Sequence, residues 1–241
     1  MGILSKVHLK IANGLGLPKK YQHDYLLDEW VKKEIKRLPK NTSIIDVGAG
    51  ERKYRKFCRH LKYTSQDASE YNGEGDGEGL QTGSWDTSKM DIVSDITSIP
   101  VKDGTFDAVL CTEVFEHVPD PQAALAELYR ILKNGGALIL TAPFMSETHF
   151  APYHFCSGFD RYWFTYHLKR TGFCDIEITP YGNLYSNFLT SMDIVMGYKK
   201  IPKWKKALGL LYKKAMIKYA MAEDDSYKVA CFGYNIVAKK A

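Results

Sequence analysis

Short runs typical of strands alternate along this chain with segments whose apolar residues recur at helical spacing. The predicted strands are 43–47, 63–67, 91–96, 106–112, 137–143, 173–179 and 231–239. The predicted helices are 21–38, 51–62, 121–132 and 161–172, with residues 133–136 as the C-cap of the third. Strands that alternate with helices predict a parallel sheet with right-handed crossovers. Ligands of such sheets bind at the carboxyl ends of the strands.

One segment interrupts this alternation. About fifty residues separate the last two predicted strands, far more than an ordinary hairpin loop needs. They hold an apolar stretch, 184–196, and a lysine-rich helix candidate, 203–221. The helix places these residues near one face: Trp204, Leu208, Leu211, Ala215 and Met216. We expect one domain over 1–241, divided into an N-terminal helical cap (1–40), a core (41–180) and a helical basic insertion (181–230).

Composition and charge are those of an ordinary globular chain, with 45% hydrophobic and 25% charged residues. The net charge of +5 is a local property, because eight lysines lie between Asp193 and Glu223 without an acid among them and the rest of the chain sums to −3. The chain has neither a secretory signal nor an apolar run long enough for a membrane span. Its five cysteines are scattered and contain no Cys-x-x-Cys pair, which favours reduced thiols, a cytoplasmic protein and no zinc cluster.

The first strand ends abruptly at Asp46-Val47-Gly48-Ala49-Gly50. A strand, a glycine turn and a helix present backbone N–H groups to a ligand, and glycine allows its close approach. The dinucleotide fingerprint fails here because Lys53 occupies the third glycine position. Asp67 ends the second strand, where a carboxylate can accept hydrogen bonds from both ribose hydroxyls of a nucleoside. The alternatives are an ordinary tight turn and a solvated aspartate.

Residues 71–90 alternate glycine with acidic residues from Asn72 to Gly79 and predict a mobile loop. The segment superficially suggests a calcium loop. It lacks the bidentate glutamate that an EF-hand carries at its twelfth position, so a flexible loop is the better interpretation.

The pentapeptide 46–50 and the segment FDAVLCTEVFEHVPDPQAALAELYRILKNGGALILTAPF (106–144) resemble class I S-adenosylmethionine (SAM) methyltransferases of the type 11 subfamily. The resemblance implies a Rossmann-like α/β fold with a seven-stranded, mostly parallel sheet, an antiparallel last strand and helices on both faces. It implies SAM as cofactor and S-adenosylhomocysteine as product. The cofactor-binding residues it implies are Asp46, Gly48, Ala49, Gly50, Asp67, Asp95, Ile96, Thr112 and Glu113. Asp95 and Ile96 match the positions that hold adenine.

The loop after the fifth strand, from Glu147 to Phe155, faces the substrate in this family. We expect His149 or His154 to act as the general base that an oxygen nucleophile requires. The alternative is that one histidine caps a turn and the other packs on Tyr162 or Trp163. The residues matching Glu113, Glu116 and His117 are implicated in metal binding in ubiquinone-type O-methyltransferases. Type 11 members without a metal also carry the Glu-His pair, so we expect no metal ion.

These observations predict an enzyme that methylates a small-molecule acceptor. The stretch 158–164 resembles a subgroup found in sugar and surface-polysaccharide pathways, so we expect O-methylation of a sugar or a lipid-linked intermediate. The alternatives are a metal-assisted quinone- or catechol-type O-methyltransferase and a SAM-binding protein without catalysis. The lysine-rich helix 199–221 suggests peripheral contact with an anionic membrane, a lid or a homodimer face. Nucleic acid is not an expected partner because aromatic residues do not alternate with the lysines.

Overall fold

The computed structural model describes residues 17–197, 201–222 and 224–241. The chain forms two compact units. One, the core unit, comprises Glu29–Thr179 and Gly233–Ala241. The other, the insertion unit, comprises Pro180–Phe232 and the described part of residues 1–28. The boundary between them falls within one helix and near the end of one strand, and each unit is described by itself.

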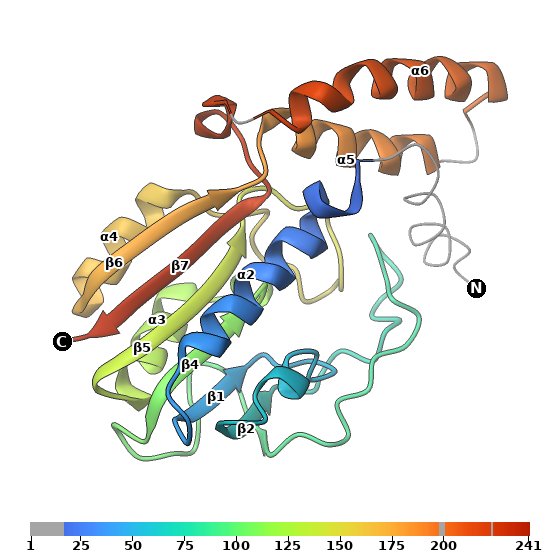
Figure 1. Cartoon of the computed structure of the whole chain (residues 1–241). Coiled ribbons are helices and arrows are strands. Elements are labelled where there is room, and N and C mark those ends of the chain that lie inside the picture. The colour runs from blue at the N-terminus through green and yellow to red at the C-terminus, as the bar shows by residue number, and fades with distance from the viewer. Residues whose placement is uncertain (1–16, 198–200, 223) are drawn as a thin grey trace. The chain divides into compact units, whose positions relative to one another are not determined.

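A seven-stranded sheet forms the core unit, with the strand order β3-β2-β1-β4-β5-β7-β6. Its strands are β1 (Ser43–Val47), β2 (Lys62–Asp67), β3 (Ile92–Val93), β4 (Phe106–Thr112), β5 (Leu132–Pro143), β6 (Phe173–Tyr181) and β7 (Gly233–Lys240). Six strands are parallel, and β7 runs antiparallel to β5, from the pair Ala137–Lys239 to the pair Pro143–Gly233. This confirms the predicted Rossmann-like fold, and Figure 1 shows β7 pointing against its neighbours.

Three helices cover the sheet: α2 (His23–Arg37) on one face, and α3 (Pro121–Ile131) and α4 (Arg161–Thr171) on the other (Figure 1). Both helices of the second face start at an aspartate cap. Asp120 accepts a hydrogen bond from the N–H of Ala123, and Asp160 accepts two from the start of α4. Gly172 ends α4 in the left-handed conformation. The central strands β1, β4 and β5 are buried between these layers, which explains their nearly continuous apolar sequences.

The predicted helix 51–62 is wrong. Only a short 3-10 helix, Arg55–Phe57, forms in this segment, because the chain leaves the glycine turn with a positive φ of 57° at Arg52. A helix cannot propagate through a residue in that conformation. The apolar spacing that suggested a helix instead reflects burial of Tyr54 and Cys58. The glycine turn is therefore not followed directly by an α-helix.

Two smaller predictions also differ from the structure. The third strand comprises only Ile92–Val93, because Asp95 accepts hydrogen bonds from the N–H and hydroxyl of Thr97 and starts a turn. Residues 133–136 are part of β5 and do not cap α3, since the chain is already extended at Leu132.

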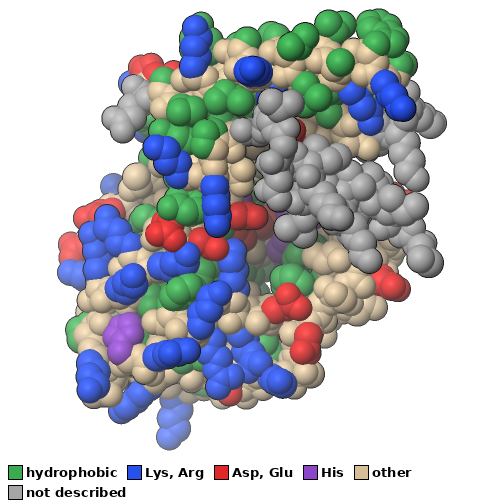
Figure 2. Space-filling model, turned by 45° about the vertical axis from the view of Figure 1, so that its right-hand side comes forward, with side chains coloured by type: hydrophobic (Ala, Val, Ile, Leu, Met, Phe, Trp, Pro, Cys, Tyr) green, Lys and Arg blue, Asp and Glu red, His purple; other side chains and the backbone are tan. Residues whose placement is uncertain are grey.

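Two helices dominate the insertion unit: α5 (Leu184–Gly197) and α6 (Lys203–Ala220). Contacts such as Tyr185 with Tyr219, at 5.4 Å between ring centroids, hold them together. The other described elements are two 3-10 turns, Lys19–Tyr21 and Ser226–Lys228. Figure 2 shows hydrophobic side chains gathered with lysines along the helices at the top of the view. Within the described residues, the helices are too short or too polar to cross a membrane.

Candidate active site

The glycine turn after β1 requires glycine at two positions. Gly48 and Gly50 have positive φ angles of 66° and 51°. A Cβ on Gly48 would lie 2.4 Å from a methyl group of Val114, and one on Gly50 would lie 2.4 Å from the ring of Trp85. Both positions therefore combine a backbone conformation that side chains disfavour with a space already filled. The predicted turn is confirmed in these terms.

Asp67 lies directly beside this turn. Its Oδ2 accepts a hydrogen bond of 2.9 Å from the N–H of Gly50, and its Oδ1 accepts one of 2.8 Å from Ser69. Each carboxylate oxygen can accept two hydrogen bonds, so these contacts fix the carboxylate and leave it capacity for ligand hydroxyls. Both hydrogen bonds to Asp95 go to Oδ1. Asp67 ends β2, and Asp95 lies two residues after the end of the neighbouring parallel strand β3, so both carboxylates lie at the same edge of the sheet.

Asp46 lies in β1, two residues before Gly48, and is only 1% exposed. Its Oδ2 accepts a hydrogen bond of 2.7 Å from the hydroxyl of Tyr63. Burial raises the pKa of the Asp46 carboxyl to about 7; the Tyr63 hydrogen bond opposes this shift and the charge of Asp67 adds to it. The hydrogen bond with Tyr63 connects the end of β1, just before the turn, with β2.

The end of β4 supplies the next predicted residues, Thr112 and Glu113. Glu113 has a positive φ of 51° and donates its N–H to Thr141, at 3.1 Å to the carbonyl. A non-glycine residue in this conformation is uncommon, and such residues gather at functional sites. Glu113 therefore redirects the chain away from β4 at the carboxyl edge of the sheet, next to the turn after β1.

Three histidines meet beyond this edge: His117, His149 and His154. His117 follows β4 in a 3-10 helix, Phe115–His117, while the other two lie in the loop after β5. The ring of Phe115 anchors this 3-10 helix because it is fully buried against Phe159, Trp163 and Phe164. Ring centroids of His149 lie 4.6 Å from His117 and 4.9 Å from His154. We call these three residues the histidine cluster.

Backbone carbonyls set the tautomers of two rings. Nδ1 of His117 donates to the carbonyl of Tyr153 at 2.5 Å, and Nδ1 of His149 donates to that of Glu147 at 2.8 Å. A neutral ring that donates through Nδ1 carries its lone pair on Nε2. These Nε2 atoms lie 3.7 and 4.0 Å from Oε1 of the buried Glu116. Burial lowers the pKa of His117 to about 4 and also lowers that of His154, so both rings are neutral at neutral pH.

The glycine-rich loop 71–90 is irregular, as predicted, and it binds the loop that carries His149. The N–H of Leu80 donates a hydrogen bond of 2.9 Å to the carbonyl of Thr148, and the carbonyl of Leu80 accepts one of 3.0 Å from the N–H of Phe150. The ring of Phe150 stacks on Tyr71 on one side and on His117 on the other, at 4.4 and 5.1 Å between centroids. The two loops therefore hold the histidine cluster together.

The sequence predicted His149 and His154 as candidate bases, and the structure brings them together. It adds His117, which the sequence associated only with Glu113 and Glu116. No local signal connects His117 with a loop more than thirty residues later. The one available clue was that both segments follow adjacent parallel strands, whose carboxyl ends share an edge.

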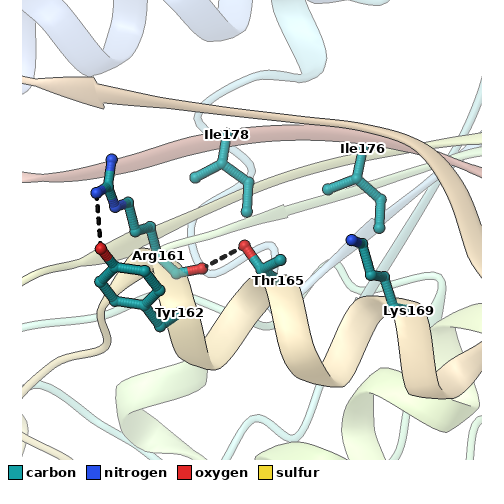
Figure 3. A pocket seen from close by; sticks show the side chains of 6 residues that line it. All are labelled: Arg161, Tyr162, Thr165, Lys169, Ile176 and Ile178. Carbon is teal, nitrogen blue, oxygen red and sulfur yellow. Dashed lines mark hydrogen bonds between the residues drawn. The ribbon is translucent and has the colours of Figure 1, made fainter.

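A hollow of about 380 Å³ lies between α4 and β6 (Figure 3). Its lining residues are Arg161, Tyr162, Thr165, Lys169, Ile176 and Ile178. Three of its polar side chains already form hydrogen bonds, since Arg161 donates to the hydroxyl of Tyr162 and Thr165 donates to the carbonyl of Arg161. The hollow contains none of the residues predicted for the site, so we do not assign the chemistry to it.

Comparison with known proteins matches residues 45–140 to the methyltransferase domain family of type 11. A sarcosine/dimethylglycine N-methyltransferase of Halorhodospira halochloris is 27% identical over 115 residues, 46% of this chain and 41% of its own length. A ubiquinone biosynthesis O-methyltransferase of Xanthomonas oryzae is 55% identical over 38 residues, 16% of either chain. This chain thus matches less than half of the length of these curated relatives.

Among solved structures, the carbon methyltransferase CurJ is similar, with a TM-score of 0.52 and 12% identity. The match covers 90% of this chain and 53% of that one. At this identity the likeness concerns the fold alone. The sheet order and the glycine turn define a class I methyltransferase fold. Residues 45–140, which span most of this fold's strands, match the methyltransferase domain family of type 11, in agreement with the fold.

Proposed function

We propose that this protein transfers the methyl group of SAM to a hydroxyl group of a small molecule, a sugar or a lipid-linked intermediate. The observation that carries the proposal is the pairing of Asp67 with the N–H of Gly50, at the sheet edge where the histidine cluster also lies. The relatives named above methylate nitrogen and oxygen, and the fold neighbour carbon, so the choice of oxygen rests on the histidines.

The residues at this edge fit SAM as cofactor. The glycines allow the backbone to turn tightly at the strand end, Asp67 is fixed for ribose hydroxyls, and Asp95 offers a carboxylate to the adenine amine. When bound, SAM supplies a methyl group already activated on a sulfonium. The protein then has to hold the acceptor in line with that methyl group and receive the hydroxyl proton.

His149 is the better placed of the two predicted proton acceptors. Its Nδ1 hydrogen bond to Glu147 leaves the lone pair on Nε2, and its side chain is 23% exposed. A neutral imidazole in this tautomer can take the proton of an acceptor hydroxyl. The rings of Tyr71 and Trp85 pack against Phe150, the residue after His149, and offer aromatic groups that suit stacking on a sugar face. The resemblance of residues 158–164 to sugar-pathway enzymes supports the same acceptor class.

The test is calorimetric titration with S-adenosylhomocysteine. We expect micromolar binding, weakened about thirtyfold in Asp67→Ala because two hydrogen bonds to an ionised acceptor are worth roughly 2 kcal/mol or more. Asp103→Ala is the matched control, since that exposed aspartate precedes β4 at the opposite edge of the sheet. Absent binding, or equal affinity of both variants, would overturn the cofactor assignment. Binding without methyl transfer to any extract fraction would favour the non-catalytic alternative.

A second proposal concerns the surface through which a lipid-linked acceptor would arrive. Trp204, Leu208 and Leu211 of α6 are 63%, 57% and 66% exposed. They share a helix face that points away from Lys213, which is 3% exposed and forms an ion pair with Asp193 of α5. Lys213 therefore adds no charge to the exposed surface of α6. Lys199 and Lys200 lie outside the described residues. The exposed lysines on α6 are Lys203, Lys205, Lys214 and Lys218.

An exposed apolar stripe between lysines is the pattern of a helix that lies on an anionic membrane. We therefore propose peripheral binding of α6 to acidic lipid. Cosedimentation with phosphatidylserine vesicles is expected to exceed that with phosphatidylcholine vesicles. Leu211→Gln is expected to weaken vesicle binding about tenfold, because one leucine side chain would no longer insert into the lipid. Val229→Gln, an equally exposed site outside α6, should have no effect. Equal sedimentation with both lipids would refute the proposal, and concentration-dependent dimerisation lost in Leu211→Gln would favour the homodimer instead.

A further inference from the structure

The histidine cluster has more ring nitrogens than a single proton acceptor requires. One nitrogen from each of His117, His149 and His154 lies within 4.8 Å of those from the other two. His117 and His149 direct Nε2 inward because their Nδ1 atoms donate to backbone carbonyls. Both nitrogens of His154 are buried and have no hydrogen-bond partner among the described residues. A buried polar group without a hydrogen-bond partner destabilises the fold, so the nitrogens of His154 indicate a ligand bound between the three rings.

We propose that His117, His149 and His154 bind one divalent transition-metal ion, with the Glu116 carboxylate beside it. Imidazole ligands favour zinc and its first-row neighbours over magnesium or calcium. Three protein ligands that leave a further position open are typical of catalytic zinc sites. Metal-binding histidines commonly donate their second ring N–H to a carbonyl, as His117 and His149 do here.

Charge also favours a cation at this place. Glu116 is 1% exposed, and its Oε1 lies 3.7 and 4.0 Å from Nε2 of His117 and His149. A buried carboxylate is stabilised by a nearby positive charge, which a metal ion bound to these rings would supply. Small rotations of the rings would bring their nitrogens to the roughly 2.1 Å that zinc–imidazole bonds require. The hydrogen bonds of Leu80 with Thr148 and Phe150 hold the loop that carries His149 in place.

This ligand set differs from the one that the resemblance to ubiquinone-type enzymes implies. It retains His117 but takes two ligands from the loop after β5 in place of Glu113. It also revises our expectation that no metal is bound. The metal site does not depend on the proposed function, but the role we give the ion rests on it: a bound ion would orient the acceptor hydroxyl and lower its pKa. His149 would then act as a ligand, and the ion would take over the activation assigned above to a histidine base.

The experiment is a titration of the chelator-treated full-length protein with cobalt(II), followed by its visible absorption, and with zinc by calorimetry. We expect one equivalent of metal per chain and d–d bands of a site with nitrogen ligands. His149→Ala and His154→Ala should each weaken binding by at least roughly tenfold. His167→Ala is the matched control, because that histidine lies on α4, outside the cluster, and packs against Trp163.

Thermal unfolding of the metal-free variants shows whether each retains the fold, and His154→Asn provides a smaller change if His154→Ala does not. Substoichiometric binding, or affinity unchanged in the His149 and His154 variants, would overturn the site. S-adenosylhomocysteine titration of the same samples separates the two proposals. Cofactor binding without metal binding would leave the histidine base standing, and metal binding without cofactor binding would refute the proposed function alone.

Discussion

Replacing Asp46 by Asn is expected to remove a loss of stability that the wild-type protein shows as the pH rises from about 4 to about 7. Burial raises the pKa of this carboxyl to about 7 in the folded protein. In the unfolded chain the group ionises near pH 4, so the folded protein binds more protons between these values. The free energy of unfolding should therefore fall across this window, by roughly 4 kcal/mol for a pKa difference of about three.

Urea denaturation of both proteins from pH 4 to pH 8 measures the difference directly. The stability of the wild type relative to Asp46→Asn should decline to about pH 7 and then level off. Asp107→Asn is the control with the opposite sign: hydrogen bonds from Lys133 and Ser43 lower the pKa of Asp107 to about 2. The stability that Asp107 contributes is complete above pH 4 and is lost only as the pH falls towards 2. A flat or rising difference curve for Asp46→Asn would contradict the prediction.

Gly75→Ala is expected to detach the loop 71–90 from the loop after β5, whereas Gly77→Ala should leave them joined. Both glycines have positive φ, 53° and 85°, so both substitutions strain the backbone. A Cβ on Gly75 would lie only 1.9 Å from the carbonyl oxygen of Ala151, while one on Gly77 would meet no described atom within 4 Å. The pair of variants therefore separates the collision from the strain.

The collision would break the hydrogen bonds that Ala151 accepts from Asp76 and Gln81, at 3.1 and 3.2 Å. Two such bonds are worth about 2 kcal/mol, so the amides of Leu80 and Phe150 should exchange hydrogen roughly thirtyfold faster in Gly75→Ala than in Gly77→Ala. Equal exchange in the two variants would show that the contact between the loops is not what protects these amides. Because His149 lies on the same loop, Gly75→Ala should also weaken metal binding by the histidine cluster.

The fold by itself does not decide the chemistry, since one architecture supports many reactions. The function proposed here therefore depends on particular contacts: Asp67 with Gly50, and the carbonyls that orient His117 and His149. In the insertion unit, too, the proposal of lipid binding depends on particular residues, those on the exposed face of α6. Each proposal can fail independently of the others.

Local sequence patterns determined most of the core. The strands 106–112 and 43–47, the helix from Pro121 and the glycine turn were all predicted, because burial periodicity and turn chemistry act within a few residues. The placement of Asp67 at a strand end followed in the same way. The segment 51–62 was the exception. Its apolar residues have helical spacing, but the positive φ at Arg52 is incompatible with an α-helix.

Only the tertiary structure decided which distant groups meet. His117 joins His149 and His154 because β4 and β5 are adjacent parallel strands whose following loops leave the same edge of the sheet. Lys213, one of eight lysines in the sequence, is buried because α5 and α6 pack with Asp193 facing it. Residues far apart along the chain carry no local signal of contact, since the packing of whole strands and helices determines their neighbours.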